Sequence, residues 1–226
     1  DAALIRDIEI SMAAGFNGAR LHQKVFEPRF LYHADRLGYM VWGEYGNWGL
    51  DTSDINSLPS VLSEWCDEIE RDYNHPSIIG WCPFNETWDK KLHPQRDDVI
   101  RYIYRITKAV DPTRPCIDTS GFFHVETDIY DIHDYEQDPE EFKRRYDLLM
   151  TENKLYEVFD PPQSHRKRFE FRQTYKGEPV FCSEYGGIRW AEGENDEKRL
   201  KSWGYGKDVP DLEAFYVRYQ GLTDVL

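Results

Sequence analysis

Residues 77–86 read Ser-Ile-Ile-Gly-Trp-Cys-Pro-Phe-Asn-Glu, an apolar run that ends in two polar residues, Asn85 and Glu86. A short apolar run of this kind is typical of a strand covered on both faces, as in a parallel sheet. A second apolar run, residues 179–184, ends in the same way at Glu184. The two runs indicate a parallel sheet with carboxylates at the ends of its strands.

Helical and strand patterns alternate along the rest of the chain. Spaced apolar residues predict helices at 2–12, 28–37, 60–73, 97–110, 139–150 and 211–220, and apolar runs predict strands at 16–22, 39–44, 77–86, 115–119, 128–133 and 179–184. This alternation predicts βαβ units. The connection between the predicted strands 115–119 and 128–133 does not fit this βαβ pattern. Its eight residues, 120–127, are fewer than the dozen or so of an ordinary crossover. Either the helix there is vestigial or one of the two strands is wrongly assigned.

Two α/β architectures compete, an open doubly wound sheet and a (β/α)₈ barrel. No glycine-rich phosphate loop follows any predicted strand, which weakens a nucleotide-binding version of the open sheet. In the barrel, polar residues at the carboxyl ends of the strands build the active site. Five strand ends carry such residues: Arg20 and His22, Glu44, Asn85 and Glu86, His133 and Tyr135, and Ser183 and Glu184. We therefore predict a fold of the TIM-barrel type.

Composition narrows the classes of partner. The 226 residues have a formal net charge of −14, which argues against nucleic acid and disfavours anionic membranes. No apolar run approaches the roughly 20 residues of a membrane span. The four cysteines fit no zinc spacing and are predicted to be free thiols. Seven tryptophans fit either a large core or a cleft that stacks against sugars.

The two strand-end glutamates suit retaining glycoside hydrolysis, which needs two carboxyl groups roughly 5 to 5.5 Å apart. Trp81 and Phe84 precede Glu86, and desolvation by such neighbours favours the protonated form of a carboxyl. Two glycines follow Tyr185 and let a substrate approach the backbone near Glu184 closely. Arg20 is a candidate partner that would keep Glu184 ionised. The alternative for any one such glutamate is a solvated residue on the rim.

Several segments together resemble the catalytic barrel of glycoside hydrolase family 2, which includes β-galactosidases, β-glucuronidases and β-mannosidases. The resemblance rests on four stretches in family order: Gly15-Phe16-Asn17-Gly18-Ala19-Arg20-Leu21-His22, Ala34-Asp35-Arg36-Leu37-Gly38-Tyr39-Met40-Val41-Trp42-Gly43-Glu44, Asn74-His75-Pro76-Ser77-Ile78-Ile79-Gly80-Trp81 running into Asn85-Glu86, and Pro179-Val180-Phe181-Cys182-Ser183-Glu184-Tyr185-Gly186.

The resemblance implies that Glu86 is the acid/base on the fourth barrel strand and Glu184 the nucleophile on the seventh. It also implies that Asn85 contacts the 2-hydroxyl of the sugar, and that Tyr135 of the His133-Asp134-Tyr135 run bonds the nucleophile. The other predicted substrate-binding residues are Arg20, His22, His133 and Trp190. Trp190 lies in the polar, aromatic segment 187–211, which is either a loop over the cleft or surface disorder.

The chain also departs from the family pattern. Strands one and eight are missing from the strand count, as are the β-sandwich domains that precede the barrel, so a partial domain over residues 1–226 is expected. Residues 44–49 hold no Glu-x-His pair, so we predict no catalytic metal and no cofactor. The acidic-sugar signature of β-glucuronidases is not evident, which leaves the sugar open.

Two functions follow from this resemblance, a retaining hydrolase of terminal β-linked sugars and a carbohydrate-binding or structural domain without turnover. Exposed strand edges predict association between copies of the chain and weak hydrolysis by the chain alone. A carbohydrate is the expected partner in either case. The sequence leaves the compartment undecided.

Overall fold

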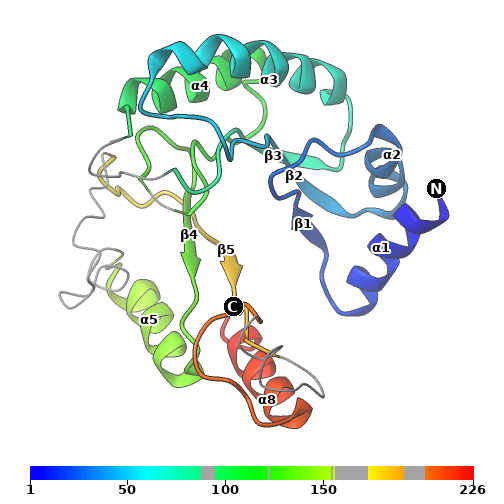
Figure 1. The fold of residues 1–226 in the computed structure, drawn as a ribbon, viewed down its shortest axis with the longest axis vertical. Helices are drawn as coiled ribbons and strands as arrows, with labels where there is room; N and C mark the ends of the chain where they lie inside the picture. Colours follow the sequence, from blue (N-terminus) through cyan, green and yellow to red (C-terminus); the bar gives the residue numbers. More distant parts are fainter. Residues whose placement is uncertain (88–94, 122, 154, 156–172, 191–201) are drawn as a thin grey trace. The chain divides into compact units, whose positions relative to one another are not determined.

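The computed structural model describes residues 1–87, 95–121, 123–153, 155, 173–190 and 202–226. Its contacts divide the chain into two units (Figure 1). The first unit comprises Asp1–Asp131 with Glu170–Phe181, and the second comprises Ile132–Phe169 with Cys182–Leu226.

The first unit is built on a three-stranded parallel sheet. Its strands are β1 (Gly18–Arg20), β2 (Met40–Glu44) and β3 (Ile78–Cys82), in the order β1-β2-β3. Both pairings are parallel, so α2 (Pro28–Leu37) and α3 (Leu58–Asp72) are crossover helices. The predicted βαβ units are therefore confirmed here.

Four helices pack with this sheet. They are α1 (Ala2–Ala13), α2, α3 and α4 (Asp97–Val110), and a short 3₁₀ helix, η1 (Ile55–Ser57), precedes α3. Figure 1 shows α3 and α4 running side by side. Pro28 begins α2, and Gly38 ends it in the left-handed conformation, as the proline and glycine predict.

Tryptophan and glycine face each other across the β2–β3 pair. Trp42 lies opposite Gly80, and Gly43 lies opposite Trp81. A Cβ atom on Gly80 would overlap the ring of Trp42, and one on Gly43 would lie 2.6 Å from the ring of Trp81. The buried Trp81 ring then meets Trp65 of α3 edge to face, with 5.8 Å between ring centroids. The missing side chains of the two glycines thus leave room for the large rings.

A smaller apolar cluster contains Trp42. Trp42, Cys82 and Ile117 are buried there, with Ile129 and Phe181 packed against them. Phe181 stacks on Trp42 at 5.8 Å. All four cysteines are free, as predicted. Burial raises the pKa of the Cys82 and Cys116 thiols well above their ordinary value, so both act as small apolar side chains.

The predicted strand at residues 115–119 does not form. This segment makes only isolated parallel bridges, Trp81 to Cys116 and Asn85 to Ser120. The side chain of Asp118 accepts hydrogen bonds from the backbone N–H groups of Thr119, Val125 and Glu126. A compact loop held by this carboxylate therefore replaces a crossover helix between Thr119 and the next strand, which explains the short junction.

The next strands are β4 (Tyr130–Asp134) and β5 (Val180–Tyr185), which pair in a two-stranded sheet. The second unit adds α5 (Pro139–Glu152) and α8 (Leu212–Thr223), which pack against each other. Both helices were predicted within three residues of their ends. Among the described residues, none of the helices has the length and apolar character that crossing a bilayer requires.

Glu68 is a buried carboxyl on α3, only 5% exposed. Its Oε2 atom makes no hydrogen bond to any described residue. Burial, followed by the negative charge of Asp72, raises the pKa of Glu68 to about 9. Glu68 is therefore protonated in the folded protein at neutral pH, whereas an unfolded chain releases this proton near pH 4.3.

We expect Glu68→Gln to stabilise the protein above pH 7. Between about pH 4.3 and 9 the folded state holds a proton that the unfolded state has lost, so stability falls as pH rises, by up to about 1.4 kcal/mol per pH unit. Glutamine cannot ionise and removes this slope. Urea unfolding at pH 5, 7 and 8.5 measures it, with the exposed Glu70→Gln as the matched control. A Glu68→Gln variant that parallels the parent at all three pH values would contradict the assignment.

Candidate active site

A buried ion pair lies at the ends of β1 and β2. The guanidinium of Arg20 donates to Oε2 of Glu44, and the two side chains are 4% and 0% exposed. The same Arg20 nitrogen donates to Oδ1 of Asn85 at 3.1 Å. Two predicted site residues, Arg20 and Asn85, are thus in direct contact. The partner of Arg20 within its unit is Glu44, and the pairing of Arg20 with Glu184 stays a prediction.

Two amide side chains extend this network. Oδ1 of Asn47 accepts from the backbone N–H of Asn85 at 2.7 Å, and Nδ2 of Asn47 donates to the backbone C=O of Asn85 at 3.1 Å. Gln23 Nε2 donates to the same Oδ1 at 2.5 Å, and the backbone N–H of Gln23 donates to Oε1 of Glu44 at 2.7 Å. The loops after β1 and β2 are therefore tied to the segment that follows β3.

Glu86, the predicted acid/base, is half-buried at the end of that segment. Its backbone N–H donates to the C=O of Ser120 at 2.9 Å. Its φ angle is +45°, in the left-handed region that a residue with a side chain seldom adopts. Beside it, Nδ2 of Asn85 is buried and makes no hydrogen bond to a described residue. An amide donor in this position suits a sugar hydroxyl.

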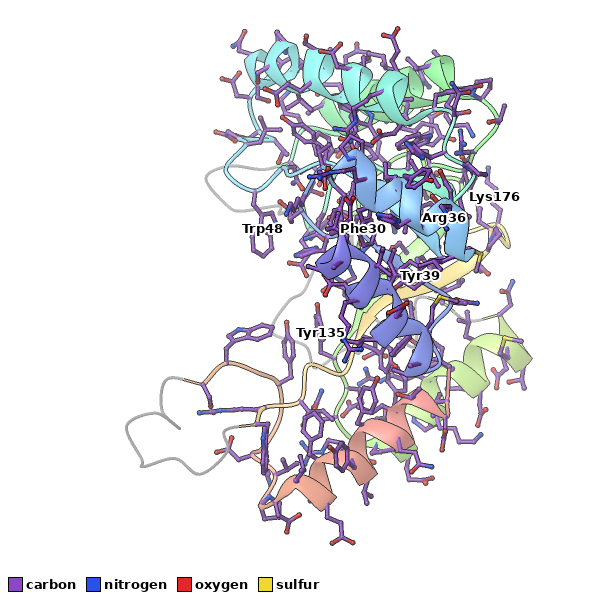
Figure 2. All side chains as sticks on the ribbon, turned by 90° about the vertical axis from the view of Figure 1, so that its right-hand side faces the viewer. Phe30, Arg36, Tyr39, Trp48, Tyr135 and Lys176 are labelled. Carbon is purple, nitrogen blue, oxygen red and sulfur yellow. The ribbon has the colours of Figure 1, made fainter. Side chains whose placement is uncertain are left out.

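His22 and Trp48 form the exposed part of this region. Nδ1 of His22 lies 3.4 Å from Oε1 of Glu44, and 47% of its side chain is exposed. Its ring meets Trp48 edge to face, with centroids 5.9 Å apart. Trp48 is 61% exposed on the loop after β2 (Figure 2). An exposed indole beside a polar ring offers both an apolar and a polar surface, a combination that is common at binding interfaces.

In the second unit, the structure brings together three predicted residues, His133, Tyr135 and Glu184. The hydroxyl of Tyr135 donates to Oε2 of Glu184. Nε2 of the buried His133 lies 3.4 Å from Oε1 of the same carboxylate. The Glu184 side chain keeps 24% of its surface exposed, so it is oriented by two ring side chains yet accessible.

Tyr205 supports Tyr135 from the loop that precedes α8. The two rings stack with centroids 3.9 Å apart and planes 12° from parallel. The backbone N–H of Tyr205 donates to the C=O of Gly187 at 2.9 Å. A Cβ atom on Gly187 would lie 2.9 Å from the Tyr205 ring. Glycine after the predicted nucleophile strand thus leaves room for a ring.

Trp190, a predicted substrate contact, packs near α8. Its half-buried ring lies 6.1 Å from the ring of Phe215. This contact is typical of packing within the unit, and a substrate contact by Trp190 stays a prediction. Trp203, nearby in sequence to Tyr205, is 76% exposed and meets the Tyr205 ring edge to face.

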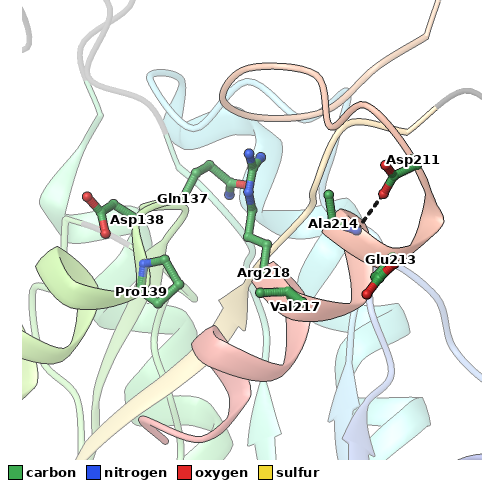
Figure 3. A pocket seen from close by; sticks show the side chains of 8 residues that line it. All are labelled: Gln137, Asp138, Pro139, Asp211, Glu213, Ala214, Val217 and Arg218. Atoms are coloured by element: carbon green, nitrogen blue, oxygen red, sulfur yellow. Dashed lines mark hydrogen bonds between the residues drawn. The ribbon is translucent and has the colours of Figure 1, made fainter.

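A separate cavity of about 650 Å³ lies between the start of α5 and α8 (Figure 3). Its lining residues are Gln137, Asp138, Pro139, Asp211, Glu213, Ala214, Val217 and Arg218. None of the predicted site residues lines this cavity.

Sequence reasoning missed three residues that hold the predicted site, Gln23, Asn47 and Tyr205. Gln23 follows the polar end of β1 and Asn47 lies three residues after Glu44. Their place directly after predicted strands is the signal that points to them. For Tyr205 the signal is its place in the aromatic segment 187–211, but its partner Tyr135 is 70 residues away in the chain, so the contact between them could not be read from the sequence.

Comparison with known proteins identifies the family. The family model for "Glycosyl hydrolases family 2, TIM barrel domain" matches residues 2–198. The chain therefore belongs to glycoside hydrolase family 2, and its fold is of the (β/α)₈ TIM-barrel type. Five strands lie within the described residues, fewer than the eight of a closed barrel.

Two curated relatives come from Enterobacter cloacae. "Beta-galactosidase 2" is 27% identical over 93% of this chain and 22% of its own length. A second β-galactosidase is 32% identical over 51% of this chain and 11% of its own length. The chain thus spans about a fifth, or less, of these relatives.

Solved structures share the fold at lower identity. A β-D-glucuronidase from Dictyoglomus thermophilum superposes with a TM-score of 0.66 at 20% identity, over 100% of this chain and 38% of that one. An FMN-binding β-glucuronidase from Facaelibacterium prausnitzii gives a TM-score of 0.72 at 19% identity, over 99% of this chain and 32% of that one.

The buried ion pair generates a stability prediction. We expect Glu44→Gln and Arg20→Met each to lower the free energy of unfolding by about 3–5 kcal/mol, because each leaves a buried charge without its partner. The double variant should cost less than the sum of the two. Denaturant unfolding measures all three, with Asp147→Asn as the control, since the exposed Lys143–Asp147 pair is worth about 1 kcal/mol or less. Additive losses would mean that the two side chains are not coupled.

Proposed function

We propose that this chain is the catalytic part of a retaining β-glycoside hydrolase that removes terminal β-linked sugars. In this proposal Glu184 is the nucleophile and Glu86 the acid/base. Family membership supports glycoside hydrolysis as the general activity. The observation that carries the assignment is the pair of ring side chains, Tyr135 and His133, on the Glu184 carboxylate.

The Tyr135 contact favours a nucleophile. A phenol hydroxyl has one proton and donates it, so the carboxylate oxygen opposite acts as the acceptor, the role of an ionised carboxylate. The Glu184 side chain, 24% exposed, keeps access to a substrate. Its second oxygen faces His133, which fixes the plane of the carboxylate. A carboxylate that is ionised, oriented and accessible is what attack at an anomeric carbon needs.

The proposed reaction has two steps. The Glu184 carboxylate attacks the anomeric carbon, and the bond to the leaving oxygen breaks as Glu86 transfers its proton to that oxygen. Glu86, now ionised, then takes a proton from water. The resulting hydroxide attacks the anomeric carbon and releases the Glu184 carboxylate. The sugar leaves with its original anomeric configuration.

Asn85 is the proposed contact for the 2-hydroxyl of the sugar. Its buried Nδ2 donor has no hydrogen-bond partner among the described residues, while its Oδ1 atom is held by Arg20. A buried donor without a partner costs roughly 1–3 kcal/mol, which a sugar hydroxyl would recover on binding. Arg20 then acts by orienting Asn85, and His22 with Trp48 is proposed to contact the sugar from the exposed side.

The sugar itself is left to experiment. The curated relatives are β-galactosidases, and the structural neighbours include β-glucuronidases and a β-galacturonidase bound to galacturonate. A panel of nitrophenyl β-glycosides of neutral and acidic sugars distinguishes these substrates. Binding of sugars without turnover by the intact protein would favour the carbohydrate-binding alternative. Association between copies of the chain and neighbouring β-sandwich domains also stay predictions.

We expect Glu184→Gln to lower kcat by roughly 10⁴-fold or more, because it removes the nucleophile. We expect Glu86→Gln to lower kcat/KM by about 10²–10⁴-fold and to abolish the alkaline limb of its pH profile, because glutamine carries no proton to donate. Steady-state kinetics from pH 4 to 10 on the intact natural protein measure both. Glu140→Gln, exposed on α5, is the control. An alkaline limb that persists at undiminished rate in Glu86→Gln would remove Glu86 from the mechanism.

The retaining mechanism also makes a geometric prediction. We expect the carboxyl groups of Glu86 and Glu184 to lie roughly 4.5 to 6.5 Å apart in a crystal structure of the intact protein. A separation beyond about 9 Å would point to inversion or to a site without catalysis. The configuration of the first product, followed by NMR, tests the same proposal independently.

A further inference from the structure

The Asn85–Glu86 segment lies beyond the regular end of β3, which stops at Cys82. On one side, the backbone of this segment bonds to the 115–120 segment, through Glu86 N–H to the C=O of Ser120 at 2.9 Å. On the other side, the last residue of β2, Glu44, pairs with Cys82. No backbone of β2 therefore pairs with Asn85 in the described ladder.

The side chain of Asn47 lies on the side of Asn85 where no residue of β2 pairs with it. Its amide accepts from the N–H and donates to the C=O of the same residue, Asn85, at 2.7 and 3.1 Å. One side chain thus bonds both backbone groups of a single residue, as a facing residue does in an antiparallel hydrogen-bonded pair. Asn47 is only 4% exposed, so water does not compete strongly for them. The carboxamide of Asn47 thus occupies both backbone groups of Asn85 at the point where the β2–β3 ladder has ended.

The orientation of this carboxamide is fixed by Gln23. Oδ1 of Asn47 receives two donors, the N–H of Asn85 and Nε2 of Gln23. An NH₂ group could not accept either bond, so Nδ2 must face the C=O of Asn85. Gln23 is itself held, since its Oε1 atom accepts from the backbone N–H of Trp48 at 2.9 Å.

The bonds of Asn47 matter for Glu86 because the backbone of Glu86 adopts an unusual conformation. A φ of +45° in a residue with a side chain persists only where its surroundings hold it. The residue before it, Asn85, is held on both its backbone groups by Asn47. Loss of these bonds removes the support of the Asn85 C=O and leaves the Glu86 N–H bonded to Ser120. A tilt of the Asn85–Glu86 peptide about that remaining bond would swing the Glu86 carboxyl, because its Cα–Cβ direction follows the backbone.

We propose that Asn47 is a positioning residue for the acid/base, acting through the backbone of Asn85, with Gln23 as its support. This inference rests on the proposed role of Glu86. Asn47 does not touch the reacting atoms in this scheme. It sets where the proton of Glu86 is delivered, and a misplacement of about 1 Å in such a group can cost roughly 10²-fold in rate.

The leaving group separates positioning from simple loss of folded protein. A phenyl β-glycoside needs its leaving oxygen protonated, whereas a 2,4-dinitrophenyl β-glycoside leaves readily as the anion. Misplacement of the acid therefore slows the first substrate far more than the second. A folding defect lowers the rates on both substrates by the same factor, because it only reduces the amount of active enzyme.

The test uses the intact natural protein and five variants, one of which is Glu86→Ala. Asn47→Leu removes both bonds and keeps a side chain of similar size, Asn47→Ala is the second truncation, and Gln23→Met removes the support alone. Asn56→Ala, an exposed asparagine on η1, is the matched control. kcat/KM is measured on phenyl and 2,4-dinitrophenyl β-galactosides, or on the corresponding glycosides of the sugar that the panel selects. Thermal unfolding of each variant is followed in parallel.

We expect Asn47→Leu and Asn47→Ala to lose about 10-fold or more on the phenyl glycoside and less than about 3-fold on the dinitrophenyl glycoside. Gln23→Met should show the same bias at smaller amplitude, and Asn56→Ala should show none. Equal losses on both substrates in the Asn47 variants would overturn the inference.

Glu86→Ala, measured beside them, separates this failure from failure of the proposed function. If Glu86→Ala shows the leaving-group bias and the Asn47 variants do not, Asn47 is not a positioning residue and the acid/base assignment stands. If Glu86→Ala itself shows no bias, the assignment of Glu86 is overturned and the inference falls with it.

Discussion

The buried pair of Arg20 and Glu44 is the constraint on which the site in the first unit depends. Both charges are almost completely removed from water, and such a pair gains little stability over an apolar pair of the same size. Two routes lead from the pair to Asn85, one directly from Arg20 and one from Glu44 through Gln23 and Asn47. The presence of a buried ion pair here is better explained by its placement of Asn85 than by a gain in stability. An apolar pair would pack as well, but it would not orient the side-chain amide of Asn85.

The local sequence pattern was sufficient to predict most of the helices and strands. The helices at residues 28–37 and 97–110 have the predicted ends, since proline, glycine and spaced apolar residues act within one helix. The segment at 115–119 differs because its outcome depends on Asp118, whose carboxylate binds backbone groups up to eight residues later. A side chain that competes with the sheet for backbone donors leaves no trace in the hydrophobic pattern.

For the site, the sequence located the residues and, through the family resemblance, the contact of Tyr135 with Glu184, but it did not identify Glu44 as a partner of Arg20. Polar residues at strand ends predicted Arg20, Asn85, His133, Tyr135 and Glu184, and the contacts of Tyr135 and His133 with Glu184 are present. Glu44 and Glu184 both end a strand, so sequence could not choose between them as the partner of Arg20. Asn47 and Tyr205 act through contacts across 38 and 70 residues, which a single sequence does not encode locally.

Two kinds of contact bear on the proposed catalytic carboxyls: side chains that reach the oxygens of Glu184, and bonds to the backbone at Asn85 and Glu86. Glu184 must be ionised when it attacks, and the hydroxyl of Tyr135 donates to one of its oxygens, which orients the carboxylate. Glu86 must donate a proton in one step and accept one in the next. Backbone bonds by way of Asn47 and Ser120 bear on the direction of its Cα–Cβ bond and act in the same way on both protonation states. Placement through the main chain therefore suits a catalytic group that cycles between two charges.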